Sequence, residues 1–250
     1  MHQYKYCKAI TSSDPTAAYH AAINERPSNG ASPGNRNKRS VGEHTKYWQP
    51  GKTLKIVIVE YNEHSFATIK NSASKWLPYI NLQFEFIELD EQTMLAATEF
   101  LGDIRVDFQP GLGSSGSSLI GTDSRTGSPD LPSMVLGTDF SSPYYESLVV
   151  HEFGHALGLG HEHQHPDAGI PWNRAKTYLH MANTTRFSKA EVDANVFPLE
   201  RSASRVYTPY DRHSIMHYQV LDELTLGDWH QPVNLHISQG DIAAVRAIYP

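Results

Sequence analysis

The sequence predicts an α+β protein with two lobes: a twisted mixed sheet with helices, then a mostly irregular lobe closed by a C-terminal helix. Strand and helix patterns alternate between residues 47 and 157, and loops dominate after residue 161. The chain ends in ISQGDIAAVRAIYP, whose apolar residues share one helical face. At 250 residues, with 39% hydrophobic and 19% charged residues, the chain can bury a large core.

Hydrophobic periodicity defines the individual elements. Continuous or alternating apolar residues predict strands at residues 54–61, 82–89, 103–109 and 134–136. Helical spacing predicts helices at residues 15–25, 65–77, 144–157, 188–195 and 238–249. Ser238 is the expected N-cap of the last helix. Residues 110–132 are rich in glycine and serine, which is typical of a long irregular loop that lines a site.

Residues 26–43 read RPSNGASPGNRNKRSVGE, a composition typical of exposed loops. A basic cluster at Arg36, Lys38 and Arg39 makes this segment an expected target of trypsin-like proteases. We therefore expect two units, an N-terminal region with a basic linker at 1–46 and a main domain at 47–250.

Composition excludes several classes of function. The net charge is −6 and no basic face stands out, which argues against a nucleic-acid partner. No apolar run approaches the ~20 residues of a transmembrane helix. The first 20 residues lack the pattern of a signal peptide. We expect a protein secreted or delivered outside the producing cell by a route that needs no such peptide; a cytoplasmic location also fits.

Residues 151–161, HEFGHALGLGH, have the spacing of a zinc site. On a helix, His151 and His155 differ by about 40° of rotation and 6 Å of rise, so both imidazoles leave one face. His161 would lie about 9 Å further along a continuing helix. The chain must therefore turn back, and Gly158 permits positive φ. A helix with incidental histidines is the alternative, but the full pattern favours one bound Zn²⁺.

Glu152 cannot share the ligand face, but it can accept a proton from a water on the metal. Its presence predicts an enzyme. The alternative is a catalytically retired, zinc-containing binding protein, and such proteins usually lose this glutamate.

The zinc motif resembles that of the metzincin clan of metallopeptidases, and two further stretches resemble the astacin family. His161 is followed by Glu162 and His163, and residues 210–218 read YDRHSIMHY, close to the astacin Met-turn pattern. The similarity covers residues 47–250, and secreted proteases and effectors of bacteria look most similar. It implies a metzincin-like fold with zinc in the cleft between the lobes.

The resemblance assigns roles to two residues. Met216 is expected beneath the zinc as a hydrophobic floor, and Tyr218 as an additional, displaceable zinc ligand. A phenol released from the metal can donate a hydrogen bond to a tetrahedral oxyanion. An ordinary core tyrosine is the alternative for Tyr218. The implied activity is a monomeric metalloendopeptidase that binds protein substrates in extended form along a sheet edge, which we expect at residues 133–137.

The sequence also departs from the family. Typical astacins carry arginines after the third histidine, where this chain has His165 and Ala168, and the family's disulfide cysteines are missing. The family preference for an acidic residue after the scissile bond is therefore not carried over. We expect surface or supporting positions, not metal ligation, for His163, His165, His213 and His217.

Cys7 is the only cysteine, so no intrachain disulfide can form. A thiolate is a strong zinc ligand, and this one precedes a cleavable linker. Cys7 is thus a candidate latency switch that holds the enzyme inactive until the linker is cut. An incidental unpaired cysteine is the alternative.

Overall fold

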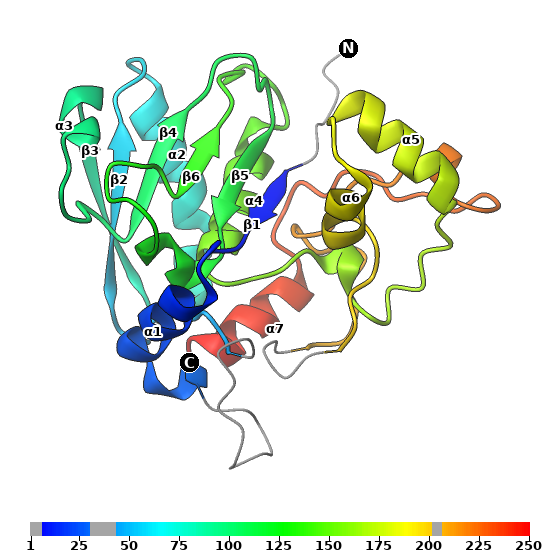
Figure 1. Cartoon of the computed structure of the whole chain (residues 1–250), viewed down its shortest axis with the longest axis horizontal. Coiled ribbons are helices and arrows are strands. Elements are labelled where there is room, and N and C mark those ends of the chain that lie inside the picture. Colours follow the sequence, from blue (N-terminus) through cyan, green and yellow to red (C-terminus); the bar gives the residue numbers. More distant parts are fainter. Residues whose placement is uncertain (1–6, 31–43, 202–206) are drawn as a thin grey trace.

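The computed structural model describes residues 7–30, 44–201 and 207–250. Its centre is a six-stranded sheet in the order β1-β5-β6-β4-β2-β3 (Figure 1). The neighbouring strands β6, β4, β2 and β3 are parallel, β5 is antiparallel to β6, and β1 is parallel to β5. In chain order the strands are β1 (Lys8–Ile10), β2 (Thr53–Val59), β3 (Gln83–Leu89), β4 (Ile104–Phe108), β5 (Gly116–Leu119) and β6 (Met134–Leu136).

The described residues form seven α-helices and five short 3₁₀ helices. The α-helices are α1 (Pro15–Glu25), α2 (Ser65–Ala73), α3 (Glu91–Leu95), α4 (Tyr145–Ala156), α5 (Arg174–Thr184), α6 (Lys189–Asn195) and α7 (Gln239–Ile248). The 3₁₀ helices are η1 (Pro27–Gly30), η2 (Ser74–Tyr79), η3 (Gly121–Arg125), η4 (Glu162–Gln164) and η5 (Asp222–Leu224). In Figure 1 the sheet lies on the left and α5 and α6 on the right, with β1 between them.

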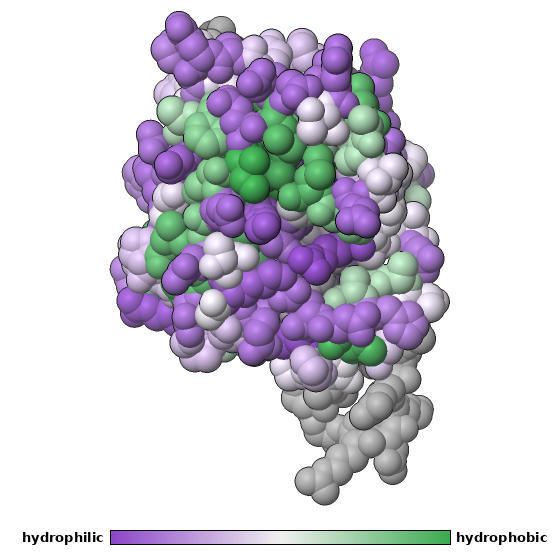
Figure 2. Space-filling model, turned by 90° about the vertical axis from the view of Figure 1, so that its left-hand side faces the viewer, coloured by the Kyte–Doolittle hydropathy of each residue, from purple (hydrophilic) through white to green (hydrophobic). Residues whose placement is uncertain are grey.

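The main core lies between the sheet and α2 and α4, and includes Ile56, Ile58 and Phe153. The opposite side of β2 buries Val57 and Val59 with Met94 of α3. Figure 2 views the molecule from the side of α3 and β3 and shows an apolar area framed by polar side chains. One face of the sheet is therefore covered by α2 and α4 over the main core, and the other by the smaller cluster with α3.

A separate small core holds the second lobe together. Met181 of α5 packs with Val192, Val196 and Phe197 in and after α6. The predicted two-lobed α+β architecture is confirmed. The second lobe has one more helix than expected, because α5 was not predicted.

Local sequence explains most helix boundaries. Asp14 caps α1 by accepting hydrogen bonds from the backbone N–H groups of Thr16 and Ala17. The predicted helix 65–77 changes to 3₁₀ geometry after Ala73, and Pro78 lies inside that 3₁₀ segment. Ser238 caps α7 through a capping box with Asp241, as predicted.

Three expectations were wrong. Residues 110–132 are not wholly irregular, because β5 lies within them. Residues 133–137 are not the sheet edge, because β6 pairs with β5 on one side and β4 on the other. Residues 27–30 are not exposed loop, because they form η1 and Asn29 is buried. The remainder of the predicted linker, 31–43 with its basic cluster, lies outside the described residues.

No helix among the described residues is long and apolar enough to cross a membrane.

Candidate metal centre

Helix α4 presents His151 and His155 from one face, and both side chains are fully buried. The carbonyls at the end of this helix are held by aromatic donors. Trp48 Nε1 donates to Ala156 O at 2.8 Å, and Tyr249 Oη donates to Leu157 O at 2.7 Å. These bonds satisfy carbonyl groups that a helix end otherwise leaves unpaired. They fix the turn from which His155 projects.

Gly158 turns the chain back, as predicted. Its φ is +96°, and an added Cβ would lie 2.6 Å from Cδ1 of Tyr47, so no other residue fits easily. The N–H of Leu159 donates to Gly154 O at 3.0 Å, and that of Gly158 to His155 O at 2.8 Å. This pair of bonds is a Schellman motif. It returns the chain so that His161 Nε2 lies 3.0 Å from His155 Nε2.

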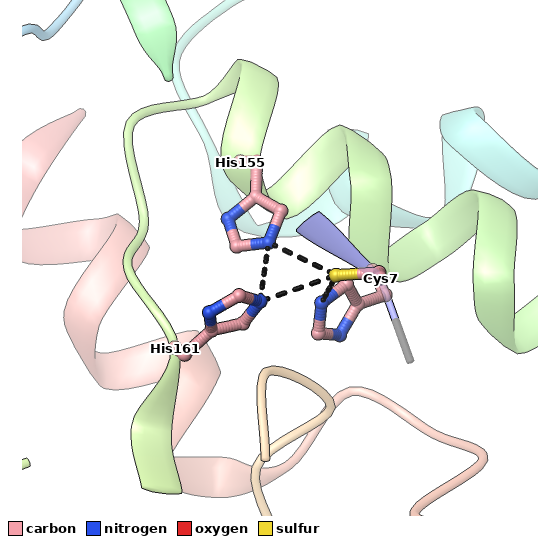
Figure 3. Close-up of side chains that lie close together, drawn as sticks. Cys7, His155 and His161 are labelled. Carbon is pink, nitrogen blue, oxygen red and sulfur yellow. Dashed lines mark hydrogen bonds between the residues drawn. The ribbon is translucent and has the colours of Figure 1, made fainter. Parts of the chain in front are cut away.

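Cys7 completes this cluster from the other end of the chain. Its Sγ lies 2.8 Å from Nε2 of His151, 3.5 Å from that of His155 and 3.1 Å from that of His161. Figure 3 shows the sulfur pointing from β1 toward the imidazoles. The four potential ligand atoms lie within 4.8 Å of one another. Three nitrogens and one sulfur so grouped fit a single tetrahedral zinc ion.

The imidazoles are oriented and kept neutral by their surroundings. His151 Nδ1 bonds to Ile215 O at 2.7 Å and His155 Nδ1 to Leu159 O at 2.9 Å, so each Nε2 points into the cluster. Burial lowers the pKa of His151 to about 4 and that of His155 to about 3. Neutral imidazole is the form that binds a metal.

The YDRHSIMHY segment lies directly beneath the cluster. A Cβ added to Gly154 of α4 would lie 2.3 Å from Met216 Sδ, so the thioether packs against the helix between the two ligand turns. The segment is anchored by α7: Asp241 accepts hydrogen bonds from Ser214 Oγ at 2.6 Å and from Ile215 N at 2.8 Å. Through Ile215 O, this anchor also fixes His151.

Glu152 is fully buried beside the cluster, and burial raises the pKa of its carboxyl well above the usual range. Its carboxylate reaches β5 of the sheet, the strand that lies between β1 and β6. A Cβ on Gly116 of β5 would lie 3.0 Å from Glu152 Oε1. Gly116 therefore leaves the space in which the carboxylate lies against β5.

Tyr218 contacts Cys7 directly. Its hydroxyl donates a hydrogen bond to Cys7 O, and its oxygen is 3.8 Å from Cys7 Sγ. The phenol ring stacks on the buried ring of His163, with centroids 4.0 Å apart and an interplanar angle of 20°. His163 thus supports Tyr218 by packing, which is one of the two kinds of position expected for it, although Tyr218 was not named as its partner.

The chain is similar to known proteins in both sequence and structure. Residues 141–225 match the model of the astacin family, which is described as a peptidase family. A structure of myroilysin is 32% identical with a TM-score of 0.72, and the alignment covers 82% of this chain and 96% of that one. The chain belongs to the astacin family. That family uses a catalytic zinc, and the three histidines with Cys7 can hold one.

Two further similarities agree with the astacin assignment. Zinc metalloproteinase nas-5 of Caenorhabditis elegans is 32% identical over 85 residues, which are 34% of this chain. That match spans about a fifth (21%) of the curated relative's length. The hatching enzyme HCE-1 of Oryzias latipes, a zinc-protease, has a TM-score of 0.54 at 19% identity, covering 82% of this chain and 94% of that one. At this identity the likeness concerns the fold.

The additional histidines take no part in the metal-capable group, as expected. His213 is exposed. His217 is buried and bonds to Tyr210 through Nε2 at 2.8 Å, and His165 Nδ1 accepts from Asp167 N at 3.0 Å. These two therefore organise loops around the centre.

Proposed function

We propose that this protein is a zinc-dependent metalloendopeptidase that hydrolyses internal peptide bonds of protein substrates. The observation that carries the proposal is the convergence of three buried imidazoles, two of them oriented through Nδ1, with the buried carboxylate of Glu152. His151, His155 and His161 would hold the zinc. When bound, the zinc supplies Lewis-acid activation, both of water and of the scissile carbonyl.

Glu152 is the proposed proton carrier. Its carboxylate takes the proton of the attacking water and delivers it to the nitrogen of the departing amine. Its burial between α4 and β5 keeps the transfer away from bulk solvent. Tyr218 is the proposed second catalytic residue and a displaceable zinc ligand, whose hydroxyl donates to the oxyanion that forms on the substrate.

Replacing Tyr218 by phenylalanine is expected to lower kcat by about 10²–10³-fold, because one oxyanion donor is lost. The ring, and hence its stacking on His163, is retained. Steady-state kinetics on a peptide substrate measure the loss, and zinc analysis of the same sample should show full occupancy. Unchanged kcat would assign Tyr218 to packing alone.

The proposed substrate site is the β5 edge. In the structure this edge is covered by β1, with Lys8 opposite Ser117 and Ile10 opposite Leu119. Once β1 leaves, the backbone groups of β5 can pair with an extended peptide beside Glu152. Backbone pairing tolerates many sequences, which suits a protease that acts on several proteins.

We propose that residues 1–46 are a prosegment and that residues 47–250 form the catalytic domain. Cys7 would supply the fourth ligand to the zinc, Tyr218 donates a hydrogen bond to the Cys7 carbonyl, and β1 covers the β5 edge. Further along, Glu25 pairs with Lys52 at 2.6 Å and Asn29 Nδ2 donates to Tyr47 O at 2.8 Å. Such contacts support a latent enzyme that is activated by cleavage within 31–43.

The proposal is tested by metal analysis and proteolysis. The full-length chain, cut in the linker by limited proteolysis and repurified, should contain about one zinc and cleave casein. Treatment with 1,10-phenanthroline should abolish cleavage, and added Zn²⁺ should restore it. A sample that holds zinc yet cuts no protein would indicate the retired binding protein instead.

Two further proposals have tests of their own. Gel filtration of the same sample tests the expected monomer. Fractionation of the source culture tests export.

A further inference from the structure

Lys8, the residue after Cys7, reaches from β1 to the second lobe. Its ammonium lies 2.9 Å from Glu191 Oε1 on α6, and 5.6 Å from the centroid of the Phe187 ring. Lys8 is therefore held by a carboxylate and an aromatic face, next to the residue that reaches the metal ligands.

Glu191 is fixed in this orientation by its own helix. It is the N3 residue of a capping box, in which its Oε2 accepts from Ser188 N and Ser188 Oγ, each at 3.0 Å. The other oxygen, Oε1, remains for Lys8. The hydrogen bond from Lys8, followed by those from Ser188, lowers the pKa of Glu191 to about 2. The carboxylate is thus a preorganised negative charge.

Lys8 also lines a cavity of about 540 Å³ that runs along the start of β5, past Gly116 and Ser117. Phe187 and His180 contribute to its wall from the second lobe. Among the residues that the structure describes, Lys8 is the only lysine or arginine in that lining. Removal of the prosegment therefore removes the cation from the cavity and leaves Glu191 without this partner at its edge.

We propose that Glu191 and Phe187 form a substrate subsite that selects a lysine or arginine side chain, in the place that Lys8 takes in the latent form. This inference rests on the proposed function, because it concerns peptides bound along β5. A substrate ammonium or guanidinium would replace the Lys8 ammonium against Glu191 and the ring of Phe187. A glutamate in that position would face Glu191 and be repelled.

The expected effect is moderate, because the Lys8 and Glu191 side chains are 42% and 40% exposed. An exposed ion pair gives a few-fold gain, and repulsion of the opposite charge adds to the contrast. We expect kcat/KM for a peptide with lysine in the subsite to exceed that of its glutamate counterpart by about threefold to tenfold.

The test uses the full-length zinc protein, activated by proteolysis in the linker and repurified. Peptides of one neutral sequence carry lysine, glutamine or glutamate at one position at a time on both sides of the scissile bond. Glu191→Gln is the main variant, because glutamine at N3 still completes the capping box. Asp193→Asn is the matched control, since Asp193 on the same helix pairs with Arg174 instead. Glu152→Gln, treated identically, is the blank for residual activating protease.

One position should favour lysine over glutamate in the parent protein. Glu191→Gln should bring that ratio close to one, Glu191→Lys should reverse it, and Asp193→Asn should leave it unchanged. Cleavage of the all-neutral peptide should be the same in the parent and Asp193→Asn proteins. Charge-independent cleavage, or an unaltered lysine preference in Glu191→Gln, would overturn the subsite while leaving the peptidase intact. Absence of cleavage of every peptide would overturn both.

Discussion

Glu152→Gln should reduce peptide hydrolysis by about 10²–10⁴-fold and leave zinc bound. Glutamine has nearly the same shape, so it fits the buried space between α4 and β5 that Gly116 leaves open. It cannot take a proton from water or return it to the leaving amine. The measurement is kcat of the linker-cleaved enzyme on a peptide substrate, with zinc content determined on the same preparation.

The control for this experiment is the metal itself. Because Glu152 is not one of the four potential ligand residues, zinc content and thermal stability should match those of the parent protein. Retention of most of the parent activity would show that another group carries the proton. Loss of zinc together with activity would mean that the substitution had disturbed α4, and Glu152→Asp, with a shorter carboxylate, would then separate chemistry from packing.

Cys7→Ala should make the uncut chain active, at least about tenfold above the parent. Each tenfold step corresponds to about 1.4 kcal/mol of lost contact between the prosegment and the metal site. The alanine removes the sulfur that lies about 3 Å from His151 and His161 and keeps the strand pairing of β1. Peptide hydrolysis by the uncut proteins, with the linker shown intact by mass spectrometry, is the required measurement.

Cys7→Ser and Lys8→Gln separate the possible causes. A neutral hydroxyl is a much weaker zinc ligand than a thiolate, so Cys7→Ser should resemble Cys7→Ala. Lys8→Gln loosens an exposed ion pair only and should activate the chain far less. Equal activities of the parent and Cys7→Ala chains would identify Cys7 as an incidental cysteine and assign latency, if any, to β1 alone.

Elements with a strong local signal were predicted closely from the sequence. Residues 15–25 and 134–136 form a helix and a strand with the expected bounds, and α4 and α7 agree within one or two residues. β5 was missed because Gly116–Leu119 reads GSSL, which has no apolar alternation. Its extended form depends on pairing with β6 and β1, which are distant in sequence. Because β5 was missed, the sheet edge expected to bind substrate was placed at residues 133–137, which include β6.

In the site, too, features with a local sequence signal were predicted and those that depend on tertiary contacts were not. The spacing of His151, His155 and His161 and the turn at Gly158 follow from helix geometry. The structure brings the three imidazoles together and gives Gly158 a positive φ of +96°. The contact of Cys7 with these residues was a hypothesis, and in the structure Cys7 Sγ lies 2.8 Å from His151 Nε2. The aromatic donors to α4 were not predicted, and for His163 only a surface or supporting position was predicted, without its partner Tyr218. These contacts depend on tertiary packing and leave no periodic trace in the sequence.

The hydrogen bond from Trp48 to Ala156 O has a consequence for maturation. Trp48 follows the linker, so a cut within 31–43 would leave it attached to the proposed catalytic domain. Asn29, in the proposed prosegment on the other side of that cut, donates a hydrogen bond to Tyr47 O. Tyr47 and Trp48 therefore form hydrogen bonds with two different parts of the chain, Asn29 before the linker and Ala156 of α4. A cut in the linker breaks the chain between these two partners. If the proposed prosegment leaves after such a cut, we expect the helix end that carries His151 and His155 to stay in place, so that activity would appear without refolding.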